Sequence, residues 1–62
     1  MEELTGLKVK ISFLTNSGVT LLSGYVIKAN TLYVLLKTNM NIVYVPLHAI
    51  KLIQLVNEHE EN

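Results

Sequence analysis

The side chains that could carry out chemistry in this 62-residue chain are few. No Asp or Glu lies between Leu4 and Asn57, so the body of the chain has no carboxylate for general acid–base catalysis. His48 has no acidic residue near it in sequence to orient its ring, and the chain has no cysteine that it could activate. The sequence therefore predicts a protein that is not an enzyme and has no catalytic residue.

Two other groups of residues are of types found in ligand sites, but their positions in the sequence do not fit such sites. Glu58, His59, Glu60 and Glu61 are of metal-ligand types, but a charged run at a chain end is usually a solvated tail. The glycines do not precede a helix at the spacing of a phosphate-binding loop. We therefore expect an acidic tail over about residues 57–62, no metal site, no cofactor and no small-molecule substrate.

The charge pattern leaves two interpretations open. All five basic residues are lysines and all five acidic residues are glutamates near the ends, so segment 4–57 carries positive charge only. Such a segment could attract an anionic partner such as RNA, but exposed lysines on strands also protect sheet edges from pairing. Without arginine, the bidentate contact typical of sequence-specific readout is missing. The predicted nucleic-acid contacts are Lys8, Lys10, Lys28, Lys37, His48 and Lys51.

The elements that must position these residues are short strands. Residues 7–13 alternate between apolar and polar, which predicts a half-buried strand. A second strand is expected from 19 to about 29, with a bulge or bend near Ser23-Gly24 where the apolar period changes. Further strands are expected at 32–37, 42–45 and 52–56, with one turn of 3₁₀ helix at 47–50. The pattern predicts an all-β fold: one domain, residues 1–62, forming a five-stranded small barrel of the SH3 or Sm type.

A helix competes with the last strand. Leu47, Ile50, Ile53 and Val56 recur at helical spacing, and Pro46 could take the first helical position. The residue before it, a valine, would be a poor N-cap, and the terminal glutamates would crowd the negative end of the helix dipole. The strand is preferred; a helix over 47–57 would replace the barrel by an α+β fold.

The last three strands are apolar on both faces. A barrel of this size can hold only one face of each strand inside, and large exposed apolar patches usually mark interfaces. A chain this short without disulfides is also marginally stable as a single copy. We therefore predict a homo-oligomer whose interface contains Ile42, Tyr44, Leu52, Ile53 and Val56.

Segment 9–55 resembles the Sm-like family to which the bacterial RNA chaperone Hfq belongs. The resemblance is carried by the alternating first strand, by Leu22-Ser23-Gly24-Tyr25-Val26, and by Val43-Tyr44 followed by His48-Ala49-Ile50. It implies rings in which the fourth strand of one subunit pairs with the fifth strand of the next, and it implies RNA binding. Of the family's uridine pocket only His48 matches; Leu32 and Leu47 stand where the family has an aromatic residue and a lysine.

A second resemblance points to sporulation. Leu4-Thr5-Gly6, the spacing from Gly18 to Gly24, and segment 43–50 are similar to a small-barrel domain of coat-associated proteins in endospore-forming bacteria.

Two functions are therefore expected. The first is a non-enzymatic, self-associating barrel that acts as a structural or protein-interaction module. The alternative is an Sm-like, Hfq-like oligomer that binds RNA with weak sequence specificity. No signal-peptide pattern and no membrane-length apolar run occurs, so a cytoplasmic location without a membrane partner is expected.

Overall fold

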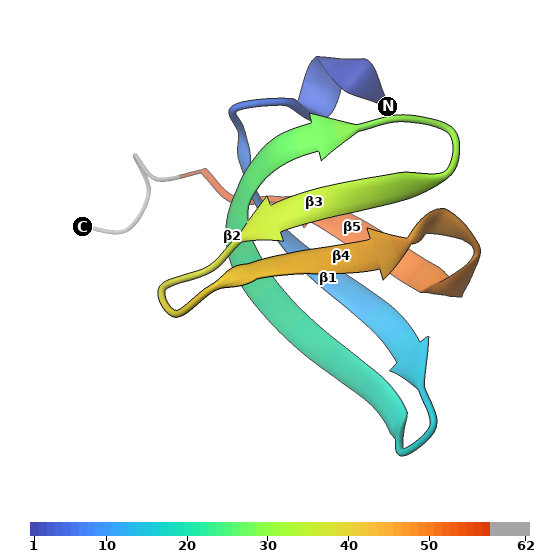
Figure 1. Ribbon diagram of the computed structural model, residues 1–62. Coiled ribbons are helices and arrows are strands. Elements are labelled where there is room, and N and C mark those ends of the chain that lie inside the picture. The colour runs from blue at the N-terminus through green and yellow to red at the C-terminus, as the bar shows by residue number, and fades with distance from the viewer. Residues whose placement is uncertain (58–62) are drawn as a thin grey trace.

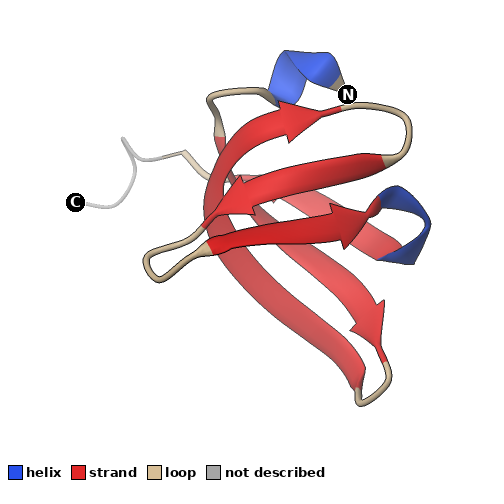
Figure 2. Ribbon diagram, in the orientation of Figure 1, coloured by secondary structure: helices blue, strands red, loops and turns tan. Residues whose placement is uncertain are grey.

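The computed structural model describes residues 1–57 and forms one antiparallel sheet of five strands in the order β4-β3-β2-β1-β5 (Figure 1). The strands are β1 Lys8–Thr15, β2 Gly18–Ala29, β3 Tyr33–Lys37, β4 Ile42–Pro46 and β5 Ile50–Leu55. Two single turns of 3₁₀ helix, η1 Glu2–Leu4 and η2 Leu47–Ala49, complete the described chain (Figure 2). The predicted all-β fold, its five strands and the 3₁₀ turn before the last strand are confirmed.

The competing helix over 47–57 is wrong. The 3₁₀ turn stops at Ala49, and Ile50–Leu55 then pairs with β1 as a strand. Tertiary pairing decides the conformation here, because β1 offers a row of backbone partners that an isolated helix would not use. Of the predicted acidic tail over 57–62, only Asn57 lies within the described residues.

The core is made by the inward-facing residues of four strands. They are branched aliphatic residues with one alanine, and each is at most 2% exposed: Val9, Ile11, Val26, Ala29, Val34, Leu36 and Val45. Burying a valine, leucine or isoleucine side chain is worth about 1.5–3 kcal/mol, so this set supplies much of the stability. Met1, Leu4 of η1, and Ile50 and Ile53 of β5 are partly buried and pack against the core cluster.

The irregularity in β2 lies further along the strand than predicted. The β1–β2 register runs unbroken from Gly18 to Tyr25, and the shift occurs between Val26 and Lys28, against β3. The change of period seen in the sequence arises because Val19 and Leu21 are simply exposed on the outer face. Gly24 has another role: a Cβ atom there would collide with the backbone carbonyl of Lys37, so β2 and β3 can approach only over a glycine.

Within residues 1–57, neither helical turn has the length or the apolar character that crossing a membrane requires. In the described part of the chain, the first and last strands of the sheet order are β4 and β5, and they do not pair with each other. These two strands therefore form the outer edges of the sheet, and they position the features described next.

Candidate functional site: the open edges of the sheet

The edge formed by β4 presents alternate backbone groups away from the sheet. Hydrogen bonds from Thr38 N–H to the Asn41 carbonyl (2.8 Å) and from Leu47 N–H to the Leu32 carbonyl (2.8 Å) mark the two ends of the β3–β4 ladder. Bonded pairs alternate in an antiparallel ladder, so the inward-facing residues of β4 are the ones that bond to β3. The outward-facing residues of β4 direct their N–H and C=O groups to the open edge.

The side chains at this open edge are large and apolar. Ile42 is 60% exposed and Tyr44 is 58% exposed. The Tyr44 ring lies 5.0 Å from the ring of Tyr33, centroid to centroid, at an interplanar angle of 32°. Pro46 ends the strand and presents only a carbonyl, because proline has no N–H. The β4 edge therefore offers two complete amide units, those of Ile42 and Tyr44.

The edge formed by β5 is complementary. The Val56 N–H donates to the Lys8 carbonyl at 3.0 Å, which sets the alternation along the β1–β5 ladder. The outward-facing residues of β5 bond to β1, and the inward-facing Ile53 and Leu55 direct their backbone groups to the open edge. Leu55 is 63% exposed although it lies on the core side of the sheet. This edge therefore also offers two amide units beside apolar side chains.

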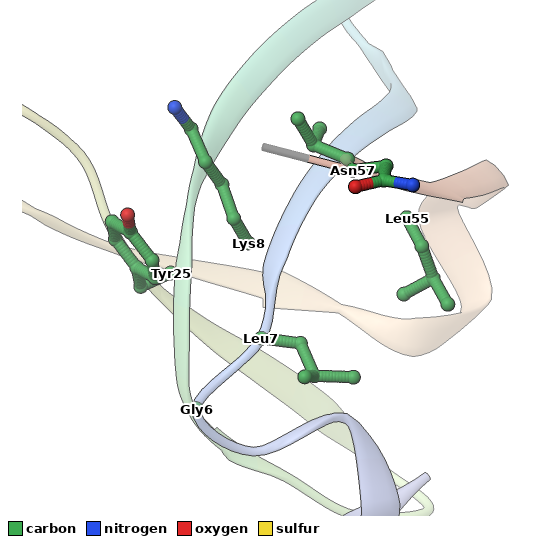
Figure 3. A pocket seen from close by; sticks show the side chains of 7 residues that line it. Gly6, Leu7, Lys8, Tyr25, Leu55 and Asn57 are labelled. Carbon is green, nitrogen blue, oxygen red and sulfur yellow. The ribbon is translucent and has the colours of Figure 1, made fainter. Parts of the chain in front are cut away.

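A hollow of about 520 Å³ lies at the C-terminal end of β5 (Figure 3). Leu7 and Leu55 make its apolar side, while Lys8 and Tyr25 lie opposite them with their polar tips pointing in a common direction. The Lys8 Nζ is 5.9 Å from the centre of the Tyr25 ring. The complete lining is Gly6, Leu7, Lys8, Tyr25, Leu55, Val56 and Asn57.

A third open edge belongs to the first half of β2. Pairing with β3 begins only at Tyr25, so the preceding residues of β2 pair with β1 alone. The bond from Val26 N–H to the Leu7 carbonyl (3.0 Å) fixes the alternation, which directs the backbone groups of Val19, Leu21 and Ser23 outward. This edge is the distal part of the β1–β2 hairpin, which extends away from the rest of the sheet (Figure 1).

Three of the five lysines lie close together on neighbouring strands. Lys8, Tyr25 and Lys37 stand directly opposite one another across β1, β2 and β3, and Lys10 stands opposite Ser23. A second hollow, of about 370 Å³, lies among them and is lined by Lys8, Ser23, Gly24, Tyr25, Lys37, Thr38 and Asn39. We call the outer surface around Lys8, Lys10 and Lys37 the lysine face.

The other predicted nucleic-acid contacts are dispersed. Lys28 lies on β2 opposite Leu35, and its Nζ is 6.0 Å from the centre of the Tyr33 ring. His48 lies in η2 and Lys51 lies at the start of β5, at the end of β5 away from Lys8. The structure thus brings Lys8, Lys10 and Lys37 together, places Lys28 further along the same face of the sheet, and leaves His48 and Lys51 apart.

The two acidic residues of η1 do not join the lysine face. Glu3 forms an ion pair with the terminal amine of Met1 at 3.1 Å. A backbone hydrogen bond, followed by the terminal ammonium, lowers the pKa of the Glu3 carboxyl. The potential metal ligands named at Glu58, His59, Glu60 and Glu61 lie outside the described residues.

Four of the five predicted interface residues lie on the two edge strands, and they do not all have the same role. Ile42, Tyr44 and Ile53 have edge-directed backbone groups, whereas Leu52 faces outward on β5 and is 53% exposed, and Val56 follows the strand. The sequence prediction did not include Leu55 in the interface. Its position two residues after Ile53, on the same face of the strand, was the signal that could have identified it. Also missed was the exposed apolar group of the first hairpin, Leu14, Val19 and Leu21.

The open edges, the hollow and the lysine face are the features from which a function can be argued. No protein-family model matches this chain, and no curated protein and no solved structure matches it either.

Proposed function

We propose that this protein is a non-enzymatic, self-associating small β-barrel of the SH3 or Sm type that acts as a structural or protein-interaction module. The observation that carries the proposal is the complementarity of the β4 and β5 edges. Each edge has two amide units directed outward, and each is bordered by apolar side chains. An exposed apolar edge is an aggregation hazard for a monomer, and pairing with another copy removes it.

The side chains favour antiparallel pairing of β4 in one copy with β5 in the next. Residues that exchange hydrogen bonds across an antiparallel ladder project to the same face. Ile42 and Tyr44 of one copy would then lie beside Leu55 and Ile53 of the next. Apolar outer side chains of one copy would meet apolar inner side chains of its neighbour, so pairing hides surface that a single copy cannot cover.

This contact is heterologous, because two different surfaces meet. Each added copy leaves one β4 edge and one β5 edge open, so the assembly either closes into a ring or grows as a filament. The Sm-like resemblance favours the ring. Either form would suit a structural module, and neither needs a catalytic residue.

The test is the native mass of matched lysine variants, measured by light scattering. Tyr44→Lys places a charge at the β4 edge and should shift the assembly to monomer. Leu21→Lys is the control, because Leu21 is 56% exposed, close to the 58% of Tyr44, but lies on the hairpin. Circular dichroism should show that both variants stay folded. A wild-type protein that is monomeric at micromolar concentration would overturn the proposal.

A second function, RNA binding with weak sequence specificity, is favoured by the lysine face. Three lysines surround Tyr25 and Ser23 there, and a symmetric assembly would multiply this positive charge. Tyr25 is 46% exposed and could stack on a base.

Salt dependence tests this second function. Homopolymer RNA should bind at 50 mM salt, and each phosphate contact should contribute about 0.7 to the slope of log affinity against log salt. Lys37→Gln should lower that slope by about this amount, whereas Lys51→Gln, which removes the same charge outside the lysine face, should leave it unchanged. Equal effects of the two variants, or no binding at 50 mM salt, would exclude the lysine face as an RNA site.

A further inference from the structure

We infer that the hollow at the end of β5 receives the Met40 side chain of a second copy, so that each such site is built from two chains. The inference rests on the proposed pairing of the β4 and β5 edges. It adds to that pairing a contact between the Met40 side chain of one copy and the hollow of the next. Its starting point is that Met40 is 90% exposed while Leu7 and Leu55 line an open hollow.

The register of the pairing follows from the open amide units. Pairing Ile42 with Leu55 and Tyr44 with Ile53 engages both units of each edge. Sliding β4 by two residues so that Tyr44 meets Leu55 would set Pro46 opposite Ile53, where proline has no N–H to donate. The first register therefore forms more hydrogen bonds.

This register carries the turn before β4 to the hollow. The antiparallel alignment of Ile42 with Leu55 places Asn41 opposite Val56 and Met40 opposite Asn57. Both Val56 and Asn57 line the hollow. Sliding the strands by two residues in the other direction sets Met40 opposite Leu55, which also lines it. Both registers therefore bring the methionine to the same site.

The turn that carries Met40 is held in shape by its own hydrogen bonds. The Thr38 hydroxyl donates to the Asn41 carbonyl at 3.1 Å and accepts from the Met40 and Asn41 N–H groups, both at 3.2 Å. A large apolar side chain on such an ordered turn contributes nothing to the core of its own copy. Little ordering entropy remains to be lost in the turn when a partner binds it.

The chemistry of the hollow suits a methionine. Leu7 is 42% exposed and Leu55 is 63% exposed on its apolar side, so an inserted side chain would cover both. Methionine adapts to irregular apolar spaces, and its sulfur makes favourable contacts with aromatic rings such as that of Tyr25. A lysine or glutamate at position 40 would leave a charge beside these leucines.

Cysteine pairing gives the sharpest test, because the chain has no cysteine of its own. Met40→Cys and Leu7→Cys should be co-expressed as separate single variants, one with a tag that changes its size, and oxidised mildly. A mixed-size disulfide dimer on non-reducing gels is the expected result. Leu7 is a better partner than Leu55 because it lies in the hollow but not on the edge strand. The control pair, Met40→Cys with Leu14→Cys, should give no mixed dimer.

A second measurement keeps the test independent of disulfide chemistry. Met40→Asp should raise the concentration at which the assembly dissociates by tenfold or more, Met40→Leu should raise it less than threefold, and Leu14→Asp should leave it unchanged. Normal native mass together with no mixed dimer and no effect of Met40→Asp would overturn the inference and leave the edge pairing standing. A monomeric wild type would instead refute the edge pairing itself.

Discussion

The β4 edge and the distal β1–β2 hairpin expose apolar side chains to the same degree, yet they offer different kinds of contact. Tyr44 is 58% exposed on the first and Leu21 is 56% exposed on the second. Both also have backbone groups directed outward. The difference is in the partner proposed for each: β4 would pair with the different edge of β5 in another copy, whereas the hairpin edge could pair with the same edge of a second copy.

This difference predicts different symmetries. Pairing of β4 with β5 is heterologous and generates a ring or a filament, while pairing of two β2 edges is isologous and stops at a dimer. The open residues of β4 and β5 are all apolar, whereas the β2 edge has Val19 and Leu21 together with Ser23. The exposed fractions of the side chains do not show which of the two edges forms the interface. The fully apolar composition of the β4 and β5 edges favours pairing of β4 with β5.

The largest expected effect comes from the residue that divides the two regions. Gly24→Ala places a methyl group against the Lys37 carbonyl. Gly24 lies just before Tyr25, where β2, until then paired with β1 alone, also begins to pair with β3. We expect a loss of unfolding free energy of about 2–4 kcal/mol, in the range of severe packing defects, measured by urea denaturation. Ser23→Ala, one residue away on the exposed face, should change stability by less than about 0.5 kcal/mol. Equal stability of Gly24→Ala and wild type would show that the close approach of β2 to β3 is not required.

A pair of proline variants compares the edges through the backbone. Ile42→Pro and Val19→Pro each remove an N–H that points away from the neighbouring strand, so a single copy should tolerate both. If β4 is the paired edge, Ile42→Pro should weaken assembly about tenfold in dissociation constant, equivalent to about 1.4 kcal/mol, and Val19→Pro should not. Analytical ultracentrifugation across a concentration series measures both. The reverse result would move the interface to the hairpin.

The smallest expected effect concerns the orientation of Tyr44. Tyr33→Leu removes the ring that lies against Tyr44, and aromatic pairs are worth about 0.5–1.5 kcal/mol beyond the area they bury. Assembly should weaken by about two- to tenfold in the same ultracentrifugation experiment. Tyr33→Phe is the matched control, because it keeps the ring that lies against Tyr44. Equal weakening by Tyr33→Phe and Tyr33→Leu would show that the ring contact is not the cause.

Much of the fold follows from local pattern. The alternation that places Val9 and Ile11 on one side of β1 requires only the two-residue period of a strand. Pro46 ends β4 because it lacks an N–H, whatever the partner strand is. The same reasoning predicted that Ile42, Tyr44 and Ile53 exceed what one small core can hold; Ile42 and Tyr44 are exposed, whereas Ile53 packs against the core.

Tertiary structure decided the features that depend on which strands are neighbours. The shift in β2 lies between Val26 and Lys28 because it adjusts the strand to β3, and the Gly24 contact likewise needs β3 in place. The grouping of Lys8 with Lys37 and the hollow beside Leu55 join residues far apart in the chain. A sequence period shows which face a side chain takes, but whether a backbone N–H is open or bonded depends on the strand beside it. The amino-acid sequence alone therefore determined the strands and their apolar faces, and only the pairing order determined the open edges.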